Sequence, residues 1–244
     1  MHIVIQGAGR GIGLALAQHA RNNGATNLYL TARNPGDSEG YKLLPPSQTT
    51  RWFNLDFINP EMIEKVGAEI VKCSPKLDRV ITCAGLLHTK TIYPEKRVLA
   101  LDPAAMMELF QINAMGPTLF FKALWPHLKL NKSLIAASIS ARVGSISDNH
   151  LGGWYSYRAS KAALNQYIRT MSIELSRYNP KASMVVIHPG TVNTSLSEPF
   201  QRNVCPDQIF SKEKAAKQIW SLLNELEPTD NGGFFAYDGA KITY

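Results

Sequence analysis

The sequence predicts a single α/β domain over residues 1–244, with about seven parallel strands in one doubly wound sheet and helices on both faces. Three observations predict it. Short apolar runs alternate with longer segments of helical periodicity. The short runs are apolar throughout, as in strands that are buried on both faces. No repeat, linker or change of composition divides the chain.

The first half of the chain supplies four strands and the helices between them. His2–Gln6 predicts a strand, 7–13 a turn, and 14–23 a helix that Gly24 terminates. The other elements expected here are strands at 27–31, 51–55 and 78–83, a surface loop at 34–50 and a helix opened by Pro60 at 60–73.

The second half continues the alternation. A loop at 86–101 precedes a long helical region at 102–130, with a kink expected at Gly116-Pro117. The remaining elements expected are strands at 133–140, 182–188 and 233–237, a helix that carries 157–161 and continues to Leu175, a helix at 212–227, and a polar loop at 191–210.

A glycine-rich turn connects the first strand to the first helix. It holds Gly7, Arg10, Gly11, Ile12 and Gly13. Glycines here let backbone N–H groups approach a pyrophosphate, and the positive end of the helix dipole favours that anion. The strand–turn–helix context makes the pattern specific for a dinucleotide.

The end of the second strand bears on which dinucleotide binds. An NAD site usually has a carboxylate there, for the ribose 2′-hydroxyl. The chain instead has Arg33, and Arg10 lies in the glycine turn. Two guanidinium groups favour a 2′-phosphate and therefore NADP(H), although Asp37 in the next loop is a weak argument for NAD.

A tyrosine and a lysine stand four residues apart in Tyr157-Arg158-Ala159-Ser160-Lys161. On a helix this spacing places both side chains on one face. An ammonium group near a phenol favours the phenolate and lowers the pKa of the tyrosine, which suits acid–base chemistry. The spacing alone recurs by chance, so its meaning depends on the glycine turn.

Taken together, the GxxxGxG turn, the YxxxK pair and Pro189-Gly190 resemble the short-chain dehydrogenase/reductase family over essentially the whole chain. The segments 142–146 and 152–161 are most similar to its C-factor group of cell–cell signalling proteins. The resemblance implies an oxidoreductase that transfers hydride between the nicotinamide of NADP(H) and a carbonyl or alcohol substrate.

The resemblance also implies roles for individual residues. Tyr157 would be the general acid or base, Lys161 would hold the nicotinamide ribose hydroxyls, and Asn113 would position Lys161 through water. A loop at about 191–211, with the apolar residues Leu196, Phe200 and Ile209, would close over the substrate. Trp154 and Tyr155 are candidates for its pocket, with a packing role as the alternative. Further cofactor contacts are implied for Asp56, Ala84, Gly85, Pro189, Gly190, Thr191 and Thr194.

Two positions depart from the family pattern. Cys83 replaces an asparagine after the fourth strand, and Ala141 stands where the catalytic serine is expected. A hydroxyl donor on the reacting oxygen would then come from Ser140, presented by a bulge, with Ser138 or no donor as the alternatives. The missing serine also motivates a second hypothesis, a cofactor-binding signalling or regulatory protein with little turnover.

Composition limits the other possibilities. Three cysteines without metal-type spacing predict a reduced, cytoplasmic protein with no metal site. The sequence predicts no signal peptide, and no apolar run has the length that a membrane span needs. The net charge of +7 is dispersed along the chain, which fits a phosphate-bearing cofactor better than nucleic acid. The resemblance implies a homodimer or homotetramer.

Overall fold

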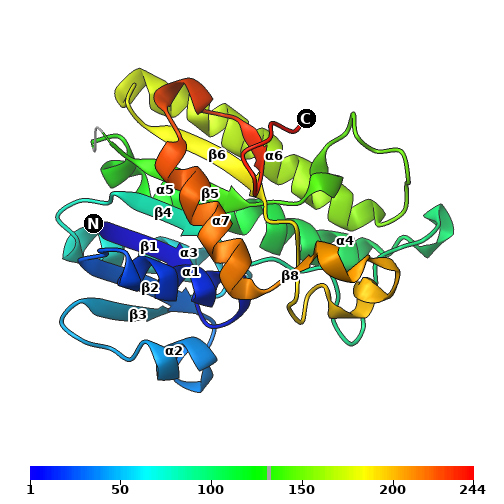
Figure 1. Ribbon diagram of the computed structural model, residues 1–244, viewed down its shortest axis with the longest axis horizontal. Coiled ribbons are helices and arrows are strands. Elements are labelled where there is room, and N and C mark those ends of the chain that lie inside the picture. Colours follow the sequence, from blue (N-terminus) through cyan, green and yellow to red (C-terminus); the bar gives the residue numbers. More distant parts are fainter. Residues whose placement is uncertain (131–132) are drawn as a thin grey trace.

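The computed structural model describes residues 1–130 and 133–244 and contains one seven-stranded parallel sheet (Figure 1). The strands lie in the order β3 (Thr50–Asn54), β2 (Asn27–Ala32), β1 (His2–Gln6), β4 (Arg79–Thr82), β5 (Ile135–Ile139), β6 (Ser183–His188) and β9 (Phe234–Ala236). Every neighbouring pair is parallel. The predicted fold class is therefore confirmed. The strand order reverses between β1 and β4, which is where open α/β sheets bind ligands.

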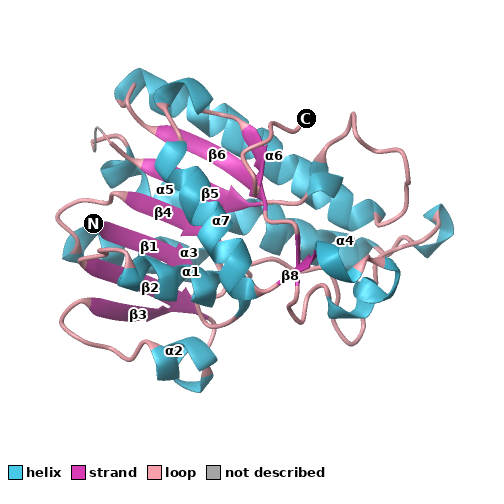
Figure 2. Cartoon of the chain, viewed as in Figure 1, coloured by secondary structure: helices cyan, strands magenta, loops and turns pink. Residues whose placement is uncertain are grey.

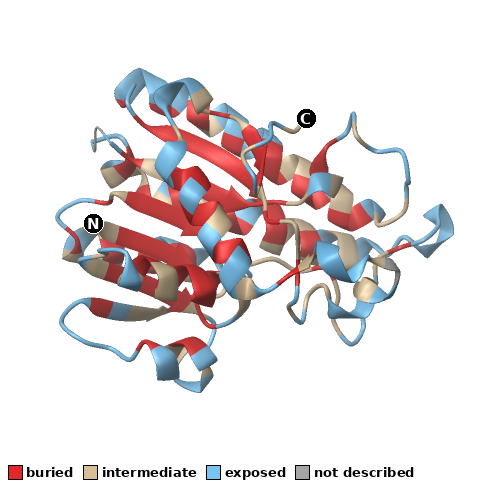
Figure 3. Ribbon diagram, viewed as in Figure 1, coloured by how far each residue is buried: buried red, intermediate tan, exposed pale blue. Residues whose placement is uncertain are grey.

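Helices cover both faces of the sheet, and Figure 2 shows them in front of and behind the strands. One face carries α1 (Gly11–Asn22) and α7 (Lys212–Glu225), and the other carries α3 (Pro60–Cys73), α5 (Gly116–Leu128) and α6 (Tyr155–Tyr178). Successive β1 residues alternate between these two cores: Ile3 and Ile5 join the first, and Val4 joins the second. The strands are accordingly the most buried part of the molecule (Figure 3).

The segment after β2 is more ordered than its composition indicates. It was expected to be a surface loop, but it forms the 3₁₀ turn η1 (Pro35–Asp37) and the helix α2 (Glu39–Leu43). The Ser38 side chain accepts a hydrogen bond from Tyr41 N at 3.2 Å and caps α2. Serine favours helix N-caps as well as loops, so a loop-like composition concealed a short helix.

The long helical region after the β4 loop is interrupted earlier than expected. It divides into α4 (Pro103–Phe110), a π-helical turn η3 (Gln111–Met115) and α5. The irregularity therefore precedes Gly116-Pro117 and contains Asn113. Single π turns inside α-helices occur often at functional sites, because the extra residue redirects a side chain.

The segment 191–210 is anchored at both ends by a small parallel sheet of β7 (Thr191–Val192) and β8 (Ile209–Phe210). Between them lie the 3₁₀ turns η5 (Glu198–Asn203) and η6 (Pro206–Gln208). The other 3₁₀ turns are η2 (Val98–Ala100), η4 (Arg142–Gly144) and η7 (Pro228–Asp230). Over the described ranges, no helix has the length and apolar character needed to cross a membrane.

Candidate active site

The glycine turn packs tightly against the segment that follows β4. Gly7 has φ +81° and Gly11 has φ +61°, a region that favours glycine. A Cβ on Gly7 would lie 2.9 Å from Ala84 N, so no larger residue fits there. The turn therefore lies beside Ala84 and Gly85, as a dinucleotide site between β1 and β4 requires.

The N-terminus of α1 has no acceptor of its own. Its N-cap, Arg10, makes no side-chain capping bond, and its first turn carries no acidic residue. The first N–H groups of a helix need acceptors, and a pyrophosphate supplies them. Both features fit the binding of the cofactor phosphates at this end of α1.

Two basic residues lie in the segments expected to reach the adenosine ribose. Arg10 and Arg33 are exposed, and the ion pairs found among the described residues involve neither of them. Asp37, the one acidic candidate, is exposed in η1. Asp56 follows β3, is half-buried, and accepts a hydrogen bond from Ile58 N at 3.2 Å.

The segment after β6 returns to the glycine turn. Pro189 is buried, and Gly190 has φ +78° and packs against the Phe210 ring. Beyond Thr191, the Thr194 methyl group lies 3.7 Å from the position of a Cβ on Gly11. The start of the expected substrate loop therefore lies beside the glycine turn.

Tyr157, Lys161 and Asn113 come together at the carboxyl ends of β4 and β5. All three are buried, and Lys161 Nζ donates to Ile139 O at 2.9 Å. A Cβ on Gly85 would lie 3.5 Å from both Asn113 Oδ1 and Lys161 Nζ. The lack of a side chain at Gly85 thus leaves a space faced by an ammonium group and an amide.

The π turn fixes the orientation of Asn113. Its Oδ1 accepts from Leu86 N and its Nδ2 donates to Leu86 O, both at 2.7 Å. Nδ2 also donates to Ser160 Oγ at 3.0 Å, on the helix that carries Tyr157. The amide therefore links the segment after β4 to α6.

Burial dominates the electrostatics of the tyrosine–lysine pair. It lowers the pKa of Lys161 to about 8 and raises the pKa of Tyr157 well above its usual range. The expectation that Lys161 lowers the pKa of Tyr157 is wrong for the chain without a cofactor. Lys161 Nζ is 6.0 Å from the Tyr157 ring centroid and is bonded to a carbonyl, so it does not offset the burial.

The Cys83 thiol lies close enough to Lys161 for the two groups to affect each other. Burial raises the pKa of Cys83 to about 12, and the Lys161 charge partly offsets this rise. A thiol with this pKa is neutral at physiological pH, so Cys83 fills the asparagine position as a small apolar group.

The structure does not direct Ser140 or Ser138 at the reacting centre. Ser140 Oγ donates to Asn165 Oδ1 at 2.6 Å, and Ser138 Oγ bonds Thr82 Oγ1 at 2.6 Å. Ser140 N donates to Ile187 O at 2.8 Å, which continues the regular β5–β6 ladder. The bulge that would present Ser140 is absent, and this part of the hypothesis is corrected.

Ala141 packs, half-buried, against the hydrophobic cluster that contains Tyr157. The cluster includes buried Leu87, Ile92 and Leu109 and the partly buried Leu86, Ala105, Val143, Trp154, Leu196 and Phe200. At position 141 the cluster therefore receives a methyl group where a serine hydroxyl was expected.

Aromatic rings connect Tyr157 to the segment after β7. The Trp154 ring lies 6.2 Å from the Tyr157 ring and 5.0 Å from the Phe200 ring, both edge-on. His88 also packs against Phe200 at 5.5 Å and bonds Ser195 O at 3.1 Å. The sequence pattern did not identify His88, because its partners lie more than one hundred residues further along the chain.

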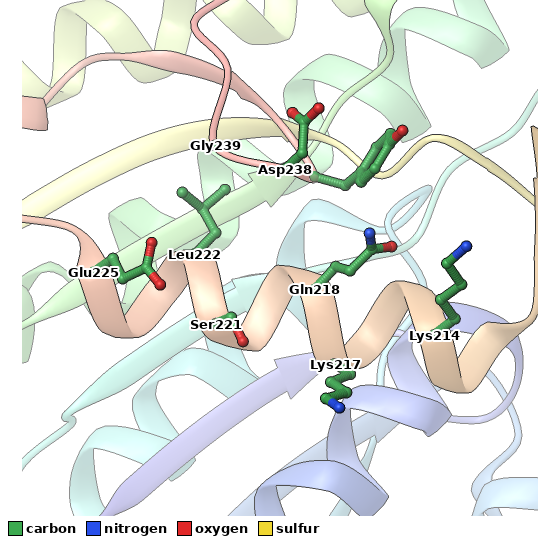
Figure 4. A pocket seen from close by; sticks show the side chains of 9 residues that line it. Lys214, Lys217, Gln218, Ser221, Leu222, Glu225, Asp238 and Gly239 are labelled. Carbon is green, nitrogen blue, oxygen red and sulfur yellow. The ribbon is translucent and has the colours of Figure 1, made fainter.

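Two surface cavities are present, and one of them shares Ile92 and Ala105 with the cluster around Tyr157. One, of about 380 Å³, lies between α7 and the turn at 237–239, and Figure 4 shows Lys214, Gln218 and Asp238 around it. The other, of about 560 Å³, is lined by residues of the 91–102 segment and of α4. Neither is lined by Tyr157 or Lys161. Within 1–130 and 133–244, no group of three His, Cys, Asp or Glu residues could hold a metal ion.

A sequence model of the short chain dehydrogenases matches residues 1–204. The chain belongs to the short-chain dehydrogenase family. This assignment confirms the resemblance inferred from the glycine turn, the tyrosine–lysine pair and Pro189-Gly190.

Three known proteins show the similarity in detail. The C-signal of Myxococcus xanthus is 34% identical over 145 residues, which cover 59% of this chain and 81% of that protein. An uncharacterized oxidoreductase of Schizosaccharomyces pombe is 27% identical over 98% of this chain and 96% of its own. The carbonyl reductase Sniffer of D. melanogaster superposes with a TM-score of 0.87 at 26% identity, covering 100% of this chain and 99% of its own. These similarities support an oxidoreductase with a C-factor-like relative.

Proposed function

We propose that this short-chain dehydrogenase is an NADP(H)-dependent carbonyl reductase or alcohol dehydrogenase in which Tyr157 is the general acid or base. One observation carries the proposal: Lys161 Nζ and Asn113 Oδ1 face the same space at Gly85, beside the glycine turn and next to Tyr157. An ammonium group, an amide and a phenol in one cleft suit the transfer of a proton to a carbonyl oxygen.

The nicotinamide, when bound, supplies the hydride that adds to the carbonyl carbon. Tyr157 donates its hydroxyl proton to the carbonyl oxygen, so that carbonyl, hydride and proton together become an alcohol. The nearby ammonium group of Lys161 stabilises the tyrosinate that remains, and Asn113 would position Lys161 through water. Burial raises the pKa of Tyr157 in the free chain, so the phenol carries the proton that it would donate.

Cofactor choice follows from the two guanidinium groups. Arg10 lies at the N-terminus of α1, Arg33 follows β2, and both are exposed without an ion-pair partner among the described residues. Each offers planar donors that match a phosphate. The proposal is that they hold the 2′-phosphate of NADP(H), while Asp56, Ala84 and Gly85 lie along the adenosine.

The substrate is proposed to be an uncharged, largely apolar carbonyl compound. Apolar and aromatic side chains form the hydrophobic cluster that contains Tyr157, and Ala141 adds a methyl group to it where a hydroxyl was expected. The loop at about 191–211 would cover this substrate through Leu196 and Phe200. Assembly as a homodimer or homotetramer and a cytoplasmic location stay predictions.

Single-turnover stopped-flow tests the proposal. NADPH-loaded protein is mixed with benzaldehyde, with cyclohexanecarbaldehyde and with 4-carboxybenzaldehyde, and the absorbance of NADPH is followed. We expect oxidation of NADPH with the two neutral aldehydes, slower oxidation with the charged one, and none in Tyr157→Phe. If no aldehyde or ketone oxidises bound NADPH, the enzymatic function is excluded.

A second candidate function is favoured by one observation. Ala141 leaves the reacting oxygen without the serine hydroxyl, and the chain is similar to the C-signal of Myxococcus xanthus. The alternative is a cofactor-binding regulatory protein with little turnover. Tight NADPH binding without turnover in the stopped-flow experiment would support it.

A further inference from the structure

The backbone that enters α6 has an unusual conformation. Gly152, Gly153 and Trp154 have φ of +63°, +65° and +52°, and Trp154 is the only non-glycine residue in the described chain with positive φ. Such a conformation is costly and persists only where neighbouring groups hold it. Because α6 begins at the next residue, this entrance sets the position of Tyr157 in the first turn.

The helix does not cap itself. Trp154, its N-cap residue, provides no side-chain hydrogen bond, and the first turn contains no acidic residue. The first N–H groups of a helix need acceptors from elsewhere. Sequence patterns of capping look for Ser, Thr, Asp or Asn at this position, so they give no signal here.

Glu95 supplies the missing acceptors from the loop after β4. Its Oε2 accepts from Ser156 N at 3.2 Å, and its Oε1 accepts from the Ser156 hydroxyl. Its main-chain O accepts from Trp154 N at 2.5 Å. One residue thus holds both the left-handed N-cap and the residue immediately before Tyr157.

The Glu95 side chain is buried, and its evident role is to accept hydrogen bonds from the start of α6. Its exposure is 6%, and none of the ion pairs among the described residues involves it. A buried carboxylate is costly unless it is hydrogen-bonded, and the N-terminus of α6 provides both donors and a favourable dipole. Arg158 holds the other side of the entrance by donating to Gly153 O at 2.9 Å and Gly152 O at 3.1 Å.

We propose that Glu95 is a positioning residue for Tyr157. It fixes the first turn of α6, and it also fixes Trp154, whose ring contacts both Tyr157 and Phe200. Loss of the Glu95 carboxylate would let the first turn fray and move the phenol from the carbonyl oxygen. The inference rests on the proposed role of Tyr157 as the acid.

The test compares Glu95→Ala, Glu95→Gln and Ser156→Ala with the wild-type chain. We expect Glu95→Ala to lower kcat for aldehyde reduction about 10- to 100-fold, with the Kd for NADPH changed less than twofold, because the glycine turn lies elsewhere. Glu95→Gln keeps one oxygen to accept from Ser156 N and should restore kcat to within about threefold of wild type. Hydrogen exchange of the amides at 154–160 should be faster in Glu95→Ala without cofactor.

A matched control separates positioning from stability. Asn59→Ala removes the cap of α3, whose Oδ1 accepts from Met62 N at 3.0 Å, and should lower Tm without changing kcat. A Glu95→Ala variant that behaves as this control does, with kcat and amide protection retained, overturns the proposal. If Glu95→Ala does not fold, wild-type kcat and amide protection in Ser156→Ala overturn it, and slower turnover with faster exchange in Ser156→Ala supports it.

The exchange measurement keeps the two proposals distinguishable. If the wild-type chain never oxidises NADPH, the proposed function is wrong. Hydrogen exchange of the amides at 154–160 still tests whether Glu95 holds the start of α6. Unchanged protection there in Glu95→Ala would then overturn the role of Glu95. Turnover by the wild type together with unchanged turnover in Glu95→Ala would overturn the positioning role alone.

Discussion

Restoring the serine hydroxyl at Ala141 should make the chain a faster reductase. Ala141 packs in the cluster around Tyr157, whereas the hydroxyl groups of Ser140 and Ser138 bond Asn165 and Thr82. A serine at 141 would therefore place a hydroxyl against the cluster that contains Tyr157. A second donor beside the Tyr157 hydroxyl stabilises the negative charge that develops on that oxygen.

The size of the effect follows from known oxyanion donors. Removing a preorganised donor costs about 10²–10³ in kcat. A hydroxyl introduced among apolar neighbours lacks that preorganisation, so we expect Ala141→Ser to recover about tenfold, or about 1.4 kcal/mol of barrier. The unpaired hydroxyl should also destabilise the free protein by about 1–3 kcal/mol, which corresponds to about 2–4 °C in Tm per kcal/mol.

The assay is kcat with saturating NADPH and benzaldehyde, measured together with Tm. Ser140→Ala is the matched variant, because it removes the bond to buried Asn165 and leaves the cluster around Tyr157 unchanged. It should lower Tm while kcat stays within about threefold. The geometric reasoning is refuted if Ser140→Ala loses tens-fold in kcat and Ala141→Ser gains nothing.

Further predictions concern the phenol, the cofactor and pH. Tyr157→Phe should lower kcat at least 10²-fold while NADPH binds within a few-fold of wild type, measured by fluorescence titration. Arg33→Ala should weaken NADPH binding about tenfold and leave NADH binding unchanged, since only NADPH carries the 2′-phosphate; an equal loss for both cofactors would remove Arg33 from this role. Burial lowers the pKa of Lys161 from the reference value of 10.5 to about 8 in the folded chain. Between these two pH values the unfolded chain binds more protons than the folded chain, so the free energy of unfolding should rise with pH. Relative to Lys161→Met, urea unfolding should show a rise on the order of 3 kcal/mol between pH 7.5 and 10.5; a flat difference would contradict the burial of the ammonium group.

The parts of the fold that follow from local patterns were predictable. Buried strands reveal themselves by apolar runs, and the glycine turn is recognisable because it lies between a strand and a helix. The segment 34–50 was mispredicted because serine and glycine serve both loops and caps. The π turn around Asn113 has no sequence signature that separates it from a helix kinked at Gly116-Pro117.

The site was predictable only where one motif holds all the necessary residues. Tyr157 and Lys161 share a helix, so their spacing places them together. The hydroxyl bond from Ser140 to Asn165 joins β5 to α6, and the Glu95 contacts join residues 61 positions apart. Such hydrogen-bond partners depend on how segments far apart in the sequence pack together. No local sequence pattern therefore predicts them.

The two changes from the family pattern differ in their expected effect on catalysis. Cys83 is neutral beside Lys161 and the proposed cofactor residues at Gly85 and Asn113. Ala141 instead places a methyl group where a hydroxyl was expected, against the cluster in which Trp154 and Phe200 pack with Tyr157. A chain built this way should bind NADPH well even where its turnover is slow. Slow chemistry with tight cofactor binding would thus follow from Ala141 alone, and a large gain in Ala141→Ser would show that the tyrosine and lysine were ready for catalysis.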